Sequence, residues 1–165
     1  MRIQFSNKNC FAPEVSVVLL DWSCRESYHI LHYVNNQKIP REQYEIIWIE
    51  YYSKQSPEIN AGLEVCEELG KPPIIDKWIV IGMPRNVYFH KHLMYNIGIL
   101  VARGKIVTFC DSDAIVGPNF VESIIKSFDE PNIVLHMDEA RNNDKRFYPF
   151  NYPSIEEVIG QGCIN

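Results

Sequence analysis

The sequence lacks the cysteine spacing that a structural zinc site or a disulfide framework requires. Its cysteines are odd in number, and none of them form a C-x-x-C pair. They stand at Cys10, Cys24, Cys66, Cys110 and Cys163. Because a disulfide framework needs paired cysteines, we expect free thiols and a reducing compartment.

The sequence also lacks a long apolar run and an excess of basic residues. No stretch approaches the roughly 20 apolar residues of a membrane span, and the first residues contain no apolar core of signal-peptide length. The formal net charge is −5 at pH 7, so the composition gives no support to nucleic-acid binding. We expect a cytoplasmic chain with no transmembrane segment, which could still lie at a membrane surface through a partner or a further segment.

What the sequence does contain is an alternation of apolar, β-branched runs with helical patterns. Near-continuous apolar runs are typical of strands that are covered on both faces. They predict strands at residues 15–20, 44–49, 77–81, 106–110 and 132–137. The alternation predicts an α/β fold with a mainly parallel, doubly wound, Rossmann-like sheet and helices on both faces.

Capping and end signals place helices between these strands. A capping box at Ser23 and Glu26 opens the first helix, Gly70 ends a helix at 59–69, and Gly117 with Pro118 opens another. The helix after Pro84 is expected to end at Gly104 in the left-handed conformation. Its predicted buried stripe consists of Phe89, Leu93, Ile97, Leu100 and Val101. A further short helix is expected near residues 154–160.

Acidic residues directly follow most of the predicted strands. They are Asp21, Glu50, the Asp111-Ser112-Asp113 triplet and the pair Asp138-Glu139. In open parallel sheets, ligands bind outside the carboxyl ends of the strands. Carboxylates as near in sequence as Asp111 and Asp113 repel each other unless a cation or a proton resolves the repulsion. A divalent cation that bridges the protein and a diphosphate would do so with oxygen ligands.

Three segments resemble the GT-A fold glycosyltransferases, specifically the family 2-like group that uses nucleotide-activated sugars. VSVVLLDWSCRES resembles the family's first strand and base-holding loop, and IIWIEYYS resembles its second strand with the acid that follows. NIGILVARGKIVTFCDSD resembles the family's Asn-x-Gly helix, Ala-x-Gly helix end, apolar strand and D-x-D. The resemblance covers about residues 14–137. It implies that residues 1–165 are a single nucleotide-sugar-binding domain, the donor half of a longer enzyme.

The resemblance also implies a role for each matching position. Trp22 would stack on a uracil ring, and Glu50 would hydrogen-bond the base. Asp113 would coordinate Mn²⁺ or Mg²⁺ on the diphosphate, while Asp111 would face the ribose or the metal. The resulting donor-binding set is Asp21, Trp22, Glu50, Asn96, Asp111 and Ser112, and the metal ligands are Asp113 and Asp111.

Other positions support or depart from the family pattern. Asn96, with Gly98 and Ala102, would let its helix pack tightly beneath the donor. Tyr51 and Tyr52 replace the family's second acid and glycine, so the loop there must have a different shape. Tyr95 stands where an arginine is frequent. No catalytic base can be assigned, and the candidate that the chain offers is Asp138, with Glu139 beside it.

The implied activity is sugar transfer from a nucleotide-diphosphate donor, a UDP-sugar, to a hydroxyl of a carbohydrate or glycolipid acceptor. It would depend on a metal and invert the anomeric configuration. Two alternatives remain open: a haloacid-dehalogenase-like phosphatase with Asp111 as nucleophile, because DSDAI matches that motif locally, and a non-catalytic nucleotide-sugar-binding domain. Positive charge near a phosphate could come from Arg85, Lys91 and Arg103, which solvated helix faces explain equally well.

Overall fold

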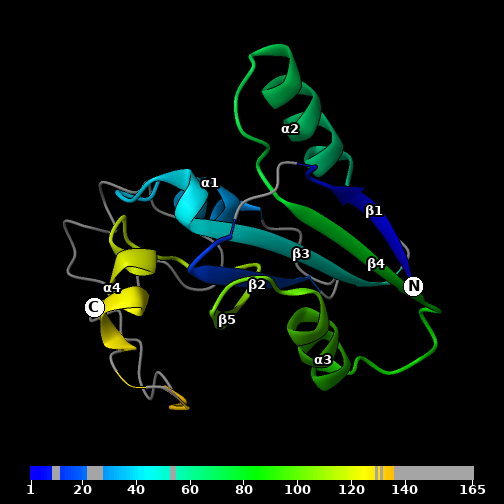
Figure 1. The fold of residues 1–165 in the computed structure, drawn as a ribbon. Helices are drawn as coiled ribbons and strands as arrows, with labels where there is room; N and C mark the ends of the chain where they lie inside the picture. Colours follow the sequence, from blue (N-terminus) through cyan, green and yellow to red (C-terminus); the bar gives the residue numbers. More distant parts are fainter. Residues whose placement is uncertain (9–11, 22–27, 53–54, 129, 131, 136–165) are drawn as a thin grey trace, which may run out of the picture.

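The computed structural model describes residues 1–8, 12–21, 28–52, 55–128, 130 and 132–135, and it has the predicted α/β fold (Figure 1). No helix within these ranges is both long enough and apolar enough to cross a bilayer. The elements in chain order are β1 (Arg2–Ser6), β2 (Val15–Asp21), α1 (His29–Asn35), the 3-10 helix η1 (Arg41–Gln43), β3 (Tyr44–Tyr52), α2 (Pro57–Glu68), β4 (Lys77–Met83), α3 (Lys91–Val101), β5 (Ile106–Asp111) and α4 (Phe120–Ser127).

The strands form one sheet with the order β1-β4-β3-β2-β5. The neighbouring pairs β4–β3, β3–β2 and β2–β5 are parallel, and β1 pairs with β4 in the antiparallel direction. The predicted mainly parallel sheet is therefore confirmed. Its four parallel strands coincide with the predicted runs within two or three residues.

Alternate side chains of the strands pack against helices on opposite faces. Val17 and Leu19 of β2 belong to a core that also contains residues of α1, α2 and α4. Val18 and Leu20 belong to a second core that contains Met94 and other residues of α3. Figure 1 shows α3 on one side of the sheet and α1 on the other. This is the doubly wound arrangement that the buried strands predicted.

Helix α3 approaches the sheet closely at Gly98. A Cβ atom at this position would lie 2.7 Å from Val18 Cγ1 and 3.0 Å from Phe109 Cε1. The predicted buried stripe of this helix is partly wrong, because Leu93 and Leu100 are 39% and 82% exposed. The residues that face the sheet are Met94, Ile97 and Gly98. The helix is apolar on most of its surface, so periodicity alone could not select the buried side.

Gly104 is required for a close backbone contact, and the predicted left-handed helix end is wrong. Positive φ among the glycines of the described segments occurs at Gly70 and Gly82. Gly70, with φ of 61°, does follow the end of α2 as predicted. At Gly104, an added Cβ would lie 2.5 Å from the Ser16 backbone nitrogen, and the Gly104 N–H donates to Ser16 Oγ at 2.8 Å.

A buried polar cluster lies at the amino ends of β2 and β3. The Glu45 side chain is fully buried, and its Oε1 accepts hydrogen bonds from Ser16 Oγ and the Arg103 N–H, each at 2.6 Å. Arg103 Nε lies 2.8 Å from Glu45 Oε2. Arg103 therefore forms an ion pair with Glu45 at the amino edge of the sheet, away from the predicted phosphate site.

The ends of the chain differ most from the predictions. Strand β1 was not predicted, because RIQFS is short and mostly exposed at the sheet edge. Residues 132–135 form no strand, and Val134 is 93% exposed, so the strand predicted at 132–137 is wrong in its described part. The helix predicted near 154–160 and the Ser23–Glu26 capping box lie outside the described residues.

Candidate functional site

The strand order defines where a ligand site is expected. The chain passes from β2 to β3 and β4 in one direction and then crosses to β5 on the other side of β2. The order therefore reverses between β2 and β5. In open α/β sheets, such a switch point opens a crevice outside the carboxyl ends of the two strands. This is the edge that carries the predicted acidic residues.

Three acidic residues lie at nearly the same level of this edge. Asp21 is in register with Glu50 on β3, and Asp111 on β5 is in register with Leu20. Since side chains alternate along a strand, Asp21 and Glu50 belong to the face covered by α1 and α2. Asp111 belongs to the α3 face. The structure thus brings the three predicted residues to one edge, but on both sides of the sheet.

The predicted metal ligands sit on a tight turn that follows β5. The Ser112 N–H donates to the Leu20 carbonyl at 3.1 Å, and the Ala114 N–H donates to the Asp111 carbonyl at 3.1 Å. Ser112 is buried, Asp113 is half-buried and Asp111 is exposed. The backbone between the two carboxylates is therefore fixed by hydrogen bonds on both sides.

The donor atoms at this turn fit a hard divalent cation only in part. Within the described ranges, no three His, Cys, Asp or Glu side chains gather as a metal-binding group. A cation such as Mg²⁺ commonly takes one or two carboxylates and completes its shell with phosphate oxygens and water. The carboxylates of Asp111 and Asp113 fit that kind of open site, in which the ligand supplies the remaining oxygens.

Lys91 is a cation at this site that the sequence did not single out for Asp111. It is the first residue of α3, and its Nζ lies 2.6 Å from Asp111 Oδ1 and 2.9 Å from Oδ2. Burial opposes the charged form of Lys91, but the hydrogen bond and attraction to Asp111 outweigh it, so the pKa of Lys91 is raised. The lysine is therefore charged when it contacts Asp111. Arg85, which was also considered as a source of positive charge near a phosphate, is exposed.

Glu50 is fully buried and is bound by the loop that precedes α2. Its Oε2 accepts a hydrogen bond from the Gln55 N–H at 2.9 Å. Its Oε1 accepts bonds from the Ser56 N–H at 3.2 Å and from Ser56 Oγ at 2.7 Å. Ser56 is the N-cap residue of α2, so the negative charge lies where the helix dipole favours it. Contact of Glu50 with a base stays a prediction, whereas its contact with this loop is observed.

Tyr51 and Tyr52, which depart from the family pattern, hold the loop between β4 and α3. The Tyr51 hydroxyl donates to the Tyr88 carbonyl at 2.8 Å, and the Tyr52 hydroxyl donates to the Val87 carbonyl at 3.1 Å. The Tyr51 ring packs edge-on against Phe89, with 5.1 Å between centroids. This loop leads directly into Lys91, so the two tyrosines help to position the start of α3.

The remaining predicted site residues are placed as follows. Asn96 is exposed on α3, so its predicted share in close helix packing is wrong and Gly98 makes that contact. Ala102 is half-buried against the core beneath α3. A donor-binding role for Asn96 stays a prediction. Trp22, Asp138 and Glu139 lie outside the described residues.

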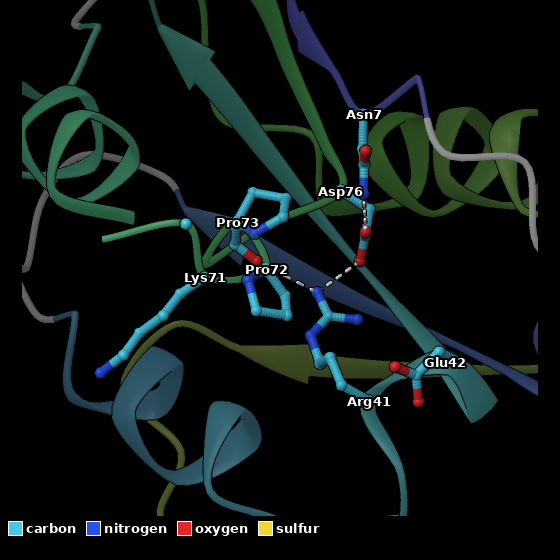
Figure 2. A pocket seen from close by; sticks show the side chains of 8 residues that line it. Asn7, Arg41, Glu42, Lys71, Pro72, Pro73 and Asp76 are labelled. Atoms are coloured by element: carbon cyan, nitrogen blue, oxygen red, sulfur yellow. Dashed lines mark hydrogen bonds and ion pairs between the residues drawn. The ribbon is translucent and has the colours of Figure 1, made fainter. Parts of the chain in front are cut away.

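A cavity of about 370 Å³ lies elsewhere, beside the start of β4 (Figure 2). Figure 2 shows Arg41 and Asn7 directed at Asp76, which is 1% exposed. Asp76 accepts hydrogen bonds from Arg41 Nη2 at 2.6 Å, the Ile46 N–H at 2.8 Å and Asn7 Nδ2 at 2.9 Å. These contacts tie η1, β3 and the end of β1 to the segment before β4. The cavity is at the amino edge of the parallel strands, opposite the predicted site.

Comparison with solved structures defines the class of the fold. S. aureus TarS 1–349 aligns with a TM-score of 0.51 and 17% identity, over 70% of this chain and 32% of TarS. The complex of TarS 1–349 with UDP-GlcNAc aligns with a TM-score of 0.51 and 14% identity, over 77% of this chain and 39% of TarS. The mannosyltransferase PcManGT from Pyrobaculum calidifontis, in complex with GDP-Man and Mn²⁺, aligns with a TM-score of 0.52 and 16% identity. The alignment covers 81% of this chain and 37% of PcManGT. The likeness establishes a GT-A glycosyltransferase fold, and the chain spans about a third of the length of these proteins.

The family assignment comes from sequence. The family model of glycosyl transferase family 2 matches residues 29–160, which is most of the chain. The chain therefore belongs to glycosyl transferase family 2, as the resemblance implied. This assignment does not support a haloacid-dehalogenase-like phosphatase. A search of the curated proteins finds no match to this chain.

Proposed function

We propose that this chain binds a nucleotide-diphosphate sugar at the carboxyl edge of β2 and β5 and is the donor-binding part of a longer glycosyltransferase. The donor would be a UDP-sugar, and the acceptor a hydroxyl of a carbohydrate or glycolipid. The observation that carries the proposal is the turn after β5, which holds Asp111 and Asp113 at the switch point of a family 2 chain. The UDP-GlcNAc and GDP-Man complexes of the structural relatives support a nucleotide sugar as ligand.

The reaction requires stabilisation of negative charge on the leaving diphosphate. The acceptor oxygen would attack the anomeric carbon as the bond from that carbon to the diphosphate oxygen breaks, with inversion. The acceptor proton would pass to a carboxylate base, for which Asp138 is the candidate. A divalent cation, when bound, supplies Lewis-acid stabilisation of the departing diphosphate. Asp113, with Asp111, would hold that Mn²⁺ or Mg²⁺ ion by carboxylate oxygens.

Calorimetry with UDP and GDP, each with and without Mn²⁺, tests the proposal. We expect Mn²⁺ to strengthen nucleotide binding to the wild-type chain, and we expect Asp113→Asn to remove that gain. The matched control is Glu58→Gln, because Glu58 is an exposed acid in the first turn of α2. Equal Mn²⁺-dependent affinity of wild type and Asp113→Asn would show that Asp113 holds no metal on the nucleotide.

A transfer assay separates the enzyme from a non-catalytic binding domain. Full-length protein incubated with a radiolabelled UDP-sugar and Mn²⁺ is expected to release UDP and pass label to an acceptor. Nucleotide binding without any UDP release would select the non-catalytic domain.

A further inference from the structure

The helices on the two faces of the sheet carry exposed apolar side chains in different surroundings. Ile99 and Leu100, in the last turn of α3, are 56% and 82% exposed. Leu69, at the end of α2 on the opposite face, is 61% exposed. Exposed apolar residues are common on protein surfaces, so their exposure alone identifies no binding surface. What distinguishes the two groups is the charge around them.

The segment that contains α3 has no acidic residue. All 21 Asp and Glu residues of the chain lie outside residues 77–110, although the net charge of the chain is −5. This segment forms β4, α3 and most of β5. Its lysines and arginines are Lys77, Arg85, Lys91, Arg103 and Lys105. The charged residues of α2, by contrast, are the glutamates Glu58, Glu64, Glu67 and Glu68.

Part of the positive charge of this segment is already used by the fold. Lys91 and Arg103 are held in the ion pairs described above. Lys105 pairs with Glu14 at 2.8 Å on the exposed surface. Because exposed pairs contribute little to stability, Lys105 can exchange Glu14 for another anion. Arg85 is exposed and forms no ion pair within the described residues.

The charges favour an anionic partner over a second copy of this chain. The cations available for contact precede α3 at Arg85 and follow it at Lys105. Two copies packed along α3, in either direction, would bring like charges together. The partner must also accept the exposed side chains of Ile99 and Leu100. The surface of an anionic bilayer meets both conditions, since its phosphates attract the cations and its acyl boundary accepts apolar side chains.

We propose that the outer side of α3 is a membrane-contact surface. Ile99 and Leu100 enter the headgroup region of an anionic bilayer, while Arg85 and Lys105 contact lipid phosphates. The inference goes beyond the proposed function and does not depend on nucleotide binding. In combination with the proposed function it has a further meaning: α3 begins beside Asp111, so the contact brings the candidate site to the bilayer surface, where a glycolipid acceptor would lie.

Flotation with lipid vesicles tests the membrane contact. Full-length protein is mixed with vesicles of equal parts phosphatidylcholine and phosphatidylglycerol, or of phosphatidylcholine alone. We expect binding to the mixed vesicles that weakens in high salt, and much weaker binding to phosphatidylcholine alone. Leu100→Gln should lower the partition coefficient about tenfold, the factor that corresponds to burial of one leucine side chain. Lys105→Gln should lower it about fivefold.

The opposite face of the sheet supplies matched controls. Leu69→Gln changes a leucine that is also largely exposed, and Lys71→Gln changes an exposed lysine just beyond α2. Both variants should bind the vesicles like wild type. Circular dichroism checks that each variant is folded. Calorimetry with UDP in the absence of vesicles should not distinguish Leu100→Gln from wild type, because Leu100 is not part of the candidate site.

The outcomes separate this inference from the proposed function. No binding of wild type to the mixed vesicles would overturn the membrane contact, and so would an equal loss in Leu69→Gln. Binding that neither Leu100→Gln nor Lys105→Gln weakens would also overturn it. A dimer that Leu100→Gln dissociates in analytical ultracentrifugation, without vesicle binding, would assign this face to a second copy instead. Vesicle binding by a protein that binds no nucleotide would overturn the proposed function and support the membrane contact.

Discussion

Replacement of Glu50 by glutamine separates a structural role of this residue from a role in base binding. Three hydrogen bonds end on its fully buried carboxylate, from the Gln55 N–H, the Ser56 N–H and Ser56 Oγ. The amide of Glu50→Gln has one acceptor oxygen and one NH₂ group, so at least one backbone donor would face another donor. Hydrogen bonds to a charged group contribute about 1.5–3 kcal/mol each.

We therefore expect Glu50→Gln to lower the free energy of unfolding by about 3 kcal/mol, from one lost bond and two weakened ones. For a chain of this length, that corresponds to a fall in Tm of about 6–12 °C. Urea unfolding and calorimetry measure the two quantities. The control Glu58→Gln changes an exposed acid in the first turn of α2, the helix that Ser56 caps, and should leave stability within about 0.5 kcal/mol. Loss of UDP binding with unchanged stability would refute the structural argument and assign Glu50 to the base alone.

Two further substitutions test the packing and the buried polar groups. Gly104→Ala should destabilise the protein by about 2 kcal/mol in urea unfolding, because its Cβ would meet backbone atoms of Val15 and Ser16. The control is Gly117→Ala, which should leave stability unchanged because a Cβ at Gly117 would have no neighbouring atom within 4 Å. Tyr44→Phe loses the hydrogen bond to the Val34 carbonyl at 2.6 Å and should cost about 1 kcal/mol at neutral pH. Burial raises the pKa of Tyr44 above 10.0. Wild type should therefore lose stability as the pH rises past 10.0, and the difference in unfolding free energy between wild type and Tyr44→Phe should shrink. A difference that stays constant with pH would contradict this.

The parallel part of the sheet was predictable because its strands are covered on both faces. Runs such as VSVVLL and YEIIWI are apolar almost throughout, and they coincide with β2 and β3. Strand β1 gave no such signal, since it is a short edge strand whose residues are mostly exposed. The run NIVL after α4 gave a false signal, because an apolar run identifies a strand only where a sheet or helix covers it. Val134 and Leu135 are exposed in the described structure.

The location of the acids of the candidate site at one edge of the sheet was predictable, but their contacts were not. The acids that follow β2, β3 and β5 could be located from the sequence, because parallel strands bring their carboxyl ends together. The pairing of Lys91 with Asp111 spans 20 residues and depends on how α3 lies on the sheet. Glu45 and Ser16 did carry a signal, since each is a polar residue inside an apolar run. Their contact with Arg103 shows that such residues can also serve the fold.

The most direct test of the donor site is a crystal structure of the chain with UDP and Mn²⁺, with anomalous data collected at the manganese edge. We predict an anomalous peak beside the Asp113 carboxylate, with the diphosphate at the carboxyl ends of β2 and β5 and Lys91 nearby. A nucleotide bound in the cavity between Arg41 and Lys71, with no manganese peak near Asp113, would contradict the assignment of the site.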